Sequence, residues 1–289
     1  MQASDVSRAV AAAKSVASTL GLAVDDAVVL QNSNKLSLRL LPCDTLARVA
    51  PLAQHVAQFE VELAGLLAET GSPAAALEAR VAPRVYECDG FAVTLWTYYT
   101  AVTPDLASAD YANALRDLHI GMRKIEISAP RFMDRVAQAE RLVASRHLTP
   151  DLDDMDRTFL GGMLKRFTRT ILDHGPAEQL LHGEPHPGNV LSTRLGPLFI
   201  DLETCCRGPV EFDLAHVPEA VVAHYPGVDQ TLLSACRGLV LVMVAAWRWD
   251  AGDQFPNGRH WGEELIRILR AGPPWPSLDA MAARLSESN

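Results

Sequence analysis

The most informative stretch of the sequence reads LLHGEPHPGNVL over residues 180–191, and FIDLE follows it over residues 199–203. The prolines and glycines of the first segment exclude a helix, so we predict a loop that presents polar side chains. Two short strands, residues 189–192 and 198–201, are predicted around a turn. Such a hairpin would bring Asn189 close to Asp201, and Glu184 precedes both on the same loop. One amide oxygen and two carboxylates would then converge.

This combination of donors suits phosphoryl transfer. Oxygen ligands hold Mg²⁺, which keeps several waters and bridges substrate phosphates. A further carboxylate accepts the proton of an acceptor hydroxyl, while positioning and charge neutralisation supply most of the catalysis. A zinc site at His182 and His186 is the alternative, but the prolines and glycines prevent the helix that would align two histidines. The pattern therefore favours magnesium-dependent phosphoryl transfer.

The rest of the chain divides into a strand-rich part and a helical part. Hydrophobic periodicity predicts a helix, three strands, another helix and two more strands at residues 4–20, 27–30, 35–41, 45–50, 52–70, 84–88 and 91–96. It then predicts helices at residues 108–123, 130–146, 153–173, 210–224, 228–249 and 260–270. We expect an α+β fold with a small antiparallel-sheet lobe at residues 1–96, a hinge at 97–104 and a larger helical lobe at 105–289.

Three linked motifs resemble the signature of aminoglycoside phosphotransferase-like enzymes, small-molecule kinases with the protein-kinase fold. They are His182-Gly183-Glu184 with Asn189, Ile200-Asp201, and Gly208-Pro209 with Asp213-Leu214-Ala215. The resemblance implies that Glu184 takes the place of the catalytic aspartate. It also implies that Asn189 and Asp201 bind Mg²⁺ and that His182 and Asp213 brace the catalytic loop.

The resemblance also assigns roles in the first lobe. A basic residue on the third strand, paired with a glutamate on the next helix, would hold the phosphates of ATP or GTP, and Arg48 and Glu60 match these positions. Arg39 competes with Arg48, and Glu62 competes with Glu60. A lysine usually stands at the position of Arg48; arginine stays charged but differs in reach and geometry.

Three further assignments concern the nucleotide and the linker. The turn that contains Asn34 would cover the phosphates, and the backbone of Trp96 and Tyr98 would read the base. Arg116 and the Leu118-His119 pair would lie on the first helix after the hinge, with a structural role.

The acceptor pocket is expected in the helical lobe. His186 could touch the acceptor or remain solvated. The stretch at the end of the apolar helix could line the pocket or form a packing corner, and the residues concerned are Trp247, Trp249, Asp250 and Asp253. The expected acceptor is a hydroxyl-bearing small molecule, an antibiotic of aminoglycoside, macrolide or nucleoside type or a metabolite. One alternative is a nucleotide-binding protein with weak or no catalysis, because glutamate replaces the usual aspartate at residue 184 and arginine the usual lysine at residue 48. The other alternative is a protein kinase.

Composition limits the partners. The 289 residues carry 26 Lys and Arg against 35 Asp and Glu, a formal net charge of −9, and 48% of them are hydrophobic. Disorder is excluded, and nucleic-acid binding is disfavoured because an acidic surface repels phosphate. The five cysteines are scattered, which favours a reducing cytoplasm. The longest apolar run, Leu239–Trp247, is too short to span a membrane. We therefore expect a cytoplasmic protein, and we expect it to be a monomer or a homodimer.

Overall fold

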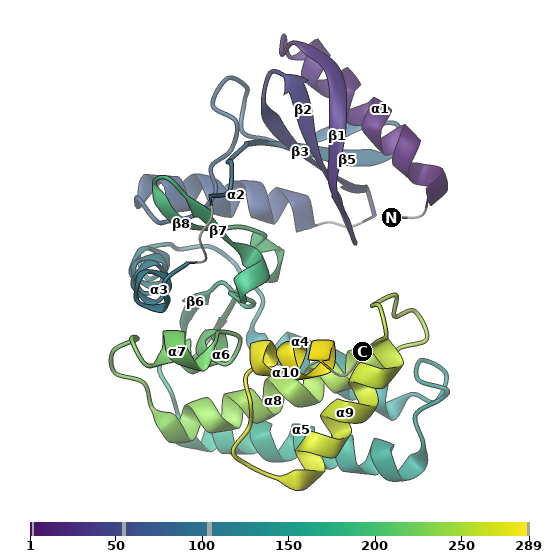
Figure 1. Ribbon diagram of the computed structural model, residues 1–289, viewed down its shortest axis with the longest axis vertical. Helices are drawn as coiled ribbons and strands as arrows, with labels where there is room; N and C mark the ends of the chain where they lie inside the picture. Colours follow the sequence, from purple (N-terminus) through teal and green to yellow (C-terminus); the bar gives the residue numbers. More distant parts are fainter. Residues whose placement is uncertain (2, 54–55, 103–105, 288–289) are drawn as a thin grey trace. The chain divides into compact units, whose positions relative to one another are not determined.

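The structure is a computed structural model that describes residues 1, 3–53, 56–102 and 106–287 (Figure 1). It consists of two compact units. The first contains Met1–Leu106, Ile120–Ile127 and Val190–Glu203. The second contains Ala107–His119, Ser128–Asn189 and the chain from Thr204 onward.

The first unit is built on an antiparallel sheet, as predicted. Its five strands have the order β1-β2-β3-β5-β4. Their bounds are β1 Val24–Asn32, β2 Leu36–Pro42, β3 Thr45–Pro51, β4 Tyr86–Cys88 and β5 Phe91–Thr97. The register places Arg48 of β3 between Ser37 of β2 and Thr94 of β5. The expectation of a small sheet lobe is therefore confirmed.

Two helices accompany this sheet. Figure 1 shows α1 (Ala3–Thr19) lying along the sheet. Buried and half-buried residues alternate along β2, so Leu36, Leu38 and Leu40 all point to the same side of the sheet. There they form a hydrophobic core with small residues of α1 such as Ala9 and Ala13. The second helix, α2 (Val56–Glu69), buries Glu60 together with its apolar side chains.

The predicted hairpin near residue 195 is also present, and it belongs to the first unit. Strand β7 (Val190–Thr193) pairs with β8 (Gly196–Phe199), with Val190 opposite Phe199. Backbone bonds of 2.8 Å join Phe199 N–H to the Pro73 carbonyl and Ala75 N–H to the Phe199 carbonyl. The short helix η2 (Leu202–Thr204) follows.

The predicted domain division therefore needs correction. Two later segments, Ile120–Ile127 and Val190–Glu203, join the first unit. The second of them is bound to it by the hairpin's hydrogen bonds, including that from Val102 N–H to the Ser192 carbonyl at 2.8 Å. The predicted hinge at 97–104 falls inside this unit, and its residues 103–104 lie outside the described part of the chain.

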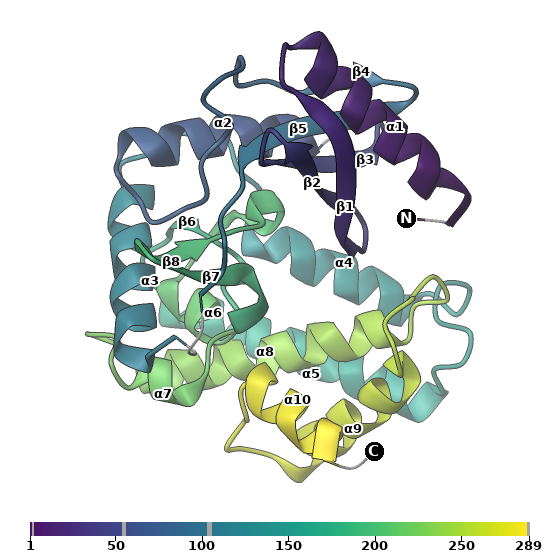
Figure 2. The same cartoon turned by 45° about the horizontal axis from the view of Figure 1, so that its top comes forward.

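The second unit is mainly helical (Figure 2). Helix α8 (Gln230–Arg248) contacts α4 (Phe132–Ala144), α5 (Asp154–His174), α6 (Val210–Leu214) and α9 (Gly258–Ala271). Helix α3 (Ser108–Met122) opens this part of the sequence. A two-stranded ribbon pairs β6 (Gln179–Leu181) with β9 (Cys206–Gly208), and η1 (Pro187–Asn189) precedes the hairpin.

Two details differ from the predicted helices. The helix predicted at residues 210–224 is two short ones, α6 and α7 (Glu219–Val222), because Pro218 lacks the N–H that a continuous helix requires. Sequence periodicity also missed α10 (Leu278–Glu287). Among the described helices, α8 alone has the length and hydropathy of a membrane span, and 67% of its most apolar window is buried in the structure, as in a core helix.

Candidate functional site

A buried ion pair joins β3 to α2 in the first unit. Arg48 donates through Nη1 to Glu60 Oε1 at 2.8 Å and through Nη2 to Asp201 Oδ1 at 2.5 Å. Burial alone would lower the pKa of Arg48, but the carboxylates of Glu60 and Asp201 raise it, so the guanidinium stays charged. The competing residues face elsewhere: Arg39 bonds Asp44 at 2.7 Å, and Glu62 accepts from Gln58 at 2.9 Å on an exposed face.

A second cation, Lys35, completes this cluster and was missed from the sequence. Its ammonium lies 2.5 Å from Glu60 Oε2, 2.6 Å from Glu203 Oε2 and 3.7 Å from Asp201 Oδ1. Lys35 is buried and ends the turn that begins at Ser33, where Ser33 N–H donates to the Lys35 carbonyl at 3.0 Å. The exposed Asn34 stands in this turn. In the sequence, Lys35 ended the turn expected to cover the phosphates and began an alternating strand, but no role was assigned to its ammonium group.

Two carboxylates at the end of the β7–β8 hairpin face these cations. Asp201 has a φ of 64°, a left-handed conformation that is uncommon outside glycine and is concentrated at functional sites. Burial and the neighbouring charge of Asp201 raise the pKa of Glu203. The cluster thus holds three carboxylates and two cations, and Asp201 and Glu203 supply oxygen donors of the kind that Mg²⁺ prefers.

The predicted base-reading segment is only partly available. On one edge of β5, Trp96 is paired with Leu46 of β3. On the other edge, the segment before β4 is hydrogen-bonded to the residues on either side of Trp96: Glu78 N–H donates to the Leu95 carbonyl, and Thr97 N–H donates to the Ala76 carbonyl. Strand β5 is therefore paired on both sides at Trp96, and the assignment of its backbone to the base stays a prediction. Tyr98 lies beyond the last residue of β5 and borders a cavity of about 650 Å³ with the tip of the β7–β8 hairpin.

In the second unit, one carboxylate organises the loop that carries Glu184. Asp213 is fully buried; its Oδ2 accepts from the backbone N–H of His182 at 2.9 Å, and its Oδ1 accepts from that of Gly183 at 2.7 Å. The ring of His119 on α3 bonds Oδ2 at 2.9 Å. Burial alone would raise the pKa of Asp213, but these bonds hold it below its ordinary value.

The surroundings of Gly183 explain why the loop needs a glycine, and the burial of α3 shows which of its predicted residues face the core. Gly183 has a φ of 87°, and a Cβ at this position would lie 2.0 Å from the Thr204 carbonyl oxygen, so the loop requires glycine. On α3, Leu118 and His119 are buried, whereas Arg116 is exposed and pairs with Asp117 at 3.3 Å.

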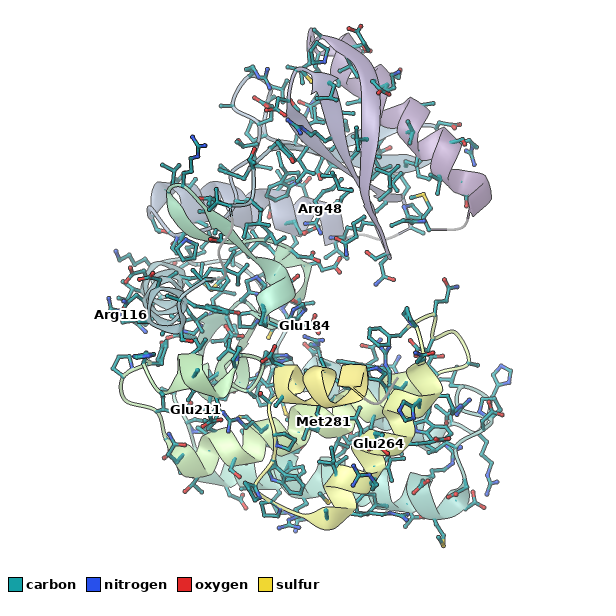
Figure 3. The ribbon with its side chains drawn as sticks, in the orientation of Figure 1. Arg48, Arg116, Glu184, Glu211, Glu264 and Met281 are labelled. Carbon is teal, nitrogen blue, oxygen red and sulfur yellow. The ribbon has the colours of Figure 1, made fainter. Side chains whose placement is uncertain are left out.

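Glu184 is held by an arginine that the sequence did not single out. Arg135 of α4 bonds the Glu184 carboxylate through Nη2 and the Gly183 carbonyl through Nη1. Burial would raise the pKa of Glu184, but the Arg135 guanidinium outweighs it and lowers the pKa. Glu184 is therefore ionised at neutral pH and able to accept a proton. Its side chain is labelled in Figure 3.

Asn189 ends the same loop. Its side-chain amide donates to the Glu184 carbonyl at 3.0 Å, which fixes the orientation of the amide. Asn189 belongs to the second unit and Asp201 to the first. Their convergence on Mg²⁺ stays a prediction. No cluster of three or more His, Cys, Asp or Glu suited to a metal occurs among the described residues.

A cavity of about 480 Å³ adjoins Glu184 within the second unit. Of the expected pocket residues, His186 and Trp247 line it. The others do not: Trp249 is buried under Arg259, Asp250 Oδ1 accepts from Gly252 N–H, and Asp253 pairs with Arg248. The wall also contains residues that sequence reasoning missed, namely His216, Val244, Arg248, Phe255, Trp261, Leu278 and Asp279.

Comparisons with known proteins agree with this geometry. The model of the phosphotransferase enzyme family (APH) matches residues 29–235. No curated protein matches the sequence. Similar solved structures include the amicoumacin kinase hAmiN in complex with AMP-PNP, Ca²⁺ and Ami, with 10% identity, a TM-score of 0.71, and coverage of 95% of this chain and 98% of that one.

Two further structures share the fold. Choline kinase LicA from Streptococcus pneumoniae is 16% identical, with a TM-score of 0.66 and coverage of 89% of this chain and 97% of that one. Spectinomycin phosphotransferase APH(9)-Ia in complex with ADP and spectinomycin is 14% identical, with a TM-score of 0.63 and coverage of 89% and 96%. These likenesses establish the α+β kinase-like fold. Because the family match spans more than half of the sequence, the chain belongs to the phosphotransferase enzyme family.

Proposed function

We propose that the protein transfers the γ-phosphoryl group of ATP or GTP to a hydroxyl group of a small molecule, with Glu184 as the general base. The observation that carries this proposal is the state of Glu184. The loop before it is held by Asp213, and Arg135 keeps its carboxylate ionised. A positioned carboxylate of this kind accepts the proton of a hydroxyl nucleophile.

The charged cluster of the first unit supports a role in binding the triphosphate. Arg48 and Lys35 are buried cations that share Glu60, and either can exchange a carboxylate for a phosphate oxygen. Asn189 and Asp201 would hold Mg²⁺, which supplies charge neutralisation at the phosphates when it is bound. The backbone of Trp96 and of Tyr98, which directly follows β5, would recognise the base.

The reaction balances as follows. The acceptor oxygen forms a bond to the γ-phosphorus, and the bond from that phosphorus to the β,γ-bridging oxygen breaks. The acceptor proton moves to a carboxylate oxygen of Glu184, and the nucleoside diphosphate departs with the electron pair of the broken bond. Arg48 offsets the negative charge that accumulates on the phosphates.

Glu184 and Asp201 variants test the proposal. Glu184→Gln keeps the size of the side chain but removes the base, so turnover should fall by at least about a hundredfold while nucleotide affinity stays unchanged. Asp201→Ala should abolish both turnover and the Mg²⁺-dependent part of nucleotide affinity. Glu62→Gln, on an exposed face of α2, is the matched control. Full turnover in Glu184→Gln would refute the assignment of the base.

The acceptor and the site of action are further parts of the proposal. We favour an antibiotic or a related metabolite as acceptor, because solved relatives of the fold carry the names of spectinomycin, amicoumacin and choline kinases. We place the activity in the cytoplasm, which the five free cysteines support. Acceptor-dependent release of nucleoside diphosphate, assayed with both triphosphates, tests the acceptor and the nucleotide together.

A further inference from the structure

The cavity beside Glu184 has aromatic walls, and two of its rings carry a guanidinium group over one face. The Arg135 guanidinium lies 5.0 Å from the ring centre of Trp247, and that of Arg248 lies 4.3 Å from the ring centre of Phe255. Trp261 meets Phe255 edge to face, with ring centres 5.6 Å apart. An aromatic cage binds an ammonium group through open ring faces. Here one face of Trp247 and one face of Phe255 are already occupied by the protein's own guanidinium groups.

His216 gives the cavity a polar group that has no partner. It is 2% exposed, and neither Nδ1 nor Nε2 has a hydrogen-bond partner among the described residues. Burial lowers the pKa of His216 to about 4, so the ring is neutral at pH 7, with one nitrogen as donor and the other as acceptor. Buried polar groups are rarely left unsatisfied, so an orphaned ring in a cavity wall points to a ligand.

Arg248 adds further donors to the same wall. Its Nη1 lies 3.3 Å from Asp253 Oδ1 in an ion pair that lacks hydrogen-bond geometry, and its Nε has no hydrogen-bond partner within the described part of the chain. An arginine guanidinium has donors only, so it matches carbonyl, ether or hydroxyl oxygens of a ligand. A ligand ammonium would be repelled by it.

The formal charges of the wall balance almost completely. Arg135 neutralises Glu184, and Asp253 neutralises Arg248, which leaves Asp279 as the other carboxylate in the lining. A polycationic acceptor would leave most of its charge without a partner in this cavity. The acidic net charge of the whole chain is therefore not concentrated here.

Building on the proposed function, we propose that the acceptor is a neutral, ring-containing alcohol with carbonyl or ether oxygens, bound by His216 and Arg248 against the aromatic wall. The volume of about 480 Å³ lies in the range of drug-sized ligands. Among the acceptors considered from the sequence, this excludes aminoglycosides and retains neutral compounds such as nucleosides. His216 and Arg248 would determine specificity without taking part in proton transfer.

The test measures direct binding to the full chain without nucleotide, by quenching of tryptophan fluorescence. Chloramphenicol and thymidine serve as neutral probes, and kanamycin and spectinomycin as cationic ones. His216→Phe retains the ring shape and Arg248→Met retains the aliphatic stem, and each should weaken the best neutral probe about tenfold. Val244→Trp, which fills the cavity, should abolish binding. The exposed residues His224→Phe and Arg267→Met are the matched controls.

Each outcome decides the proposal. Binding of a neutral probe, weakened by the three cavity variants and not by the controls, supports it. Tighter binding of the cationic probes, equal affinity in His216→Phe, or no binding of either neutral probe up to about 1 mM overturns it. Turnover is assayed separately: a neutral probe that binds the cavity and is never phosphorylated contradicts the proposed function, whereas phosphorylation of kanamycin alone contradicts only the assignment of the acceptor.

Discussion

Asp213→Asn should destabilise the second unit strongly. Three donors converge on this fully buried carboxylate, at 2.7, 2.9 and 2.9 Å. Asparagine keeps one oxygen but places an NH₂ group where the second oxygen accepts. At least one backbone N–H of the catalytic loop would then face another donor instead of an acceptor.

The size of the effect follows from the burial of these groups. Removing one partner of a buried charged network costs about 3–5 kcal/mol, because the remaining groups stay desolvated and unpaired. For a chain of this length, the loss corresponds to a decrease in Tm of about 6–20 °C. The loop also carries Glu184, so turnover should fall together with stability.

Urea unfolding followed by tryptophan fluorescence measures this loss. Four of the five tryptophans, residues 247, 249, 261 and 275, belong to the second unit, so the signal reports mainly on it. Asp229→Asn is the matched control, because Asp229 caps α8 from an exposed position and asparagine caps a helix as well as aspartate does. The control should unfold at nearly the wild-type urea concentration.

The pH dependence gives a second check on the same carboxylate. The pKa of Asp213 is lower in the folded protein than in the unfolded chain. Its contribution is therefore complete above about pH 4 and is lost as the pH falls through the folded pKa. The stability difference between wild type and Asp213→Asn should shrink in acid. A loss below about 1 kcal/mol at pH 7 would refute this reasoning.

Three further predictions concern other parts of the two units. Arg135→Met should raise the pKa of Glu184, so the acid limb of the kcat profile should move to higher pH; an unchanged profile would contradict the role of Arg135. Glu60→Gln removes the carboxylate that the buried cations Lys35 and Arg48 share, so the free energy of unfolding, measured in urea or by heating, should fall by about 3 kcal/mol, and nucleotide affinity should change. A change within about 0.5 kcal/mol, the effect of an ordinary surface substitution, would contradict a stabilising role of the cluster. Gly183→Ala should cost about 1–3 kcal/mol and lower turnover, because alanine is strained at a positive φ and its Cβ would collide with a carbonyl; wild-type activity would show that the loop can relax.

Local patterns in the sequence were sufficient for much of the fold. The alternation of residues 36–40 predicted β2, and the turn near residue 195 predicted the β7–β8 hairpin. The pairing of Arg48 with Glu60 also followed from strand and helix positions within a recognisable family layout. Pro218 was a visible sequence signal that the helix predicted at residues 210–224 would be interrupted, and the prediction overlooked it.

Contacts between residues far apart in the sequence could not be predicted in the same way. Lys35 reaches Glu203 across 168 positions, and Arg135 reaches Glu184 across 49, and neither pair has a spacing rule that would reveal it. His216 lay inside an apparent helix, where a buried histidine gives no local signal. Such side chains are identified only when the packing of separate elements is known.

The most direct measurement is mass spectrometry of an acceptor after incubation with the protein, Mg²⁺ and ATP or GTP. The proposed function predicts that the acceptor gains the mass of one phosphoryl group, HPO₃, in step with release of the nucleoside diphosphate. Glu184→Gln should reduce both products equally. Release of nucleoside diphosphate with no phosphorylated acceptor, or full transfer by Glu184→Gln, would contradict the assignment of this chain as a small-molecule phosphotransferase that uses Glu184 as its base.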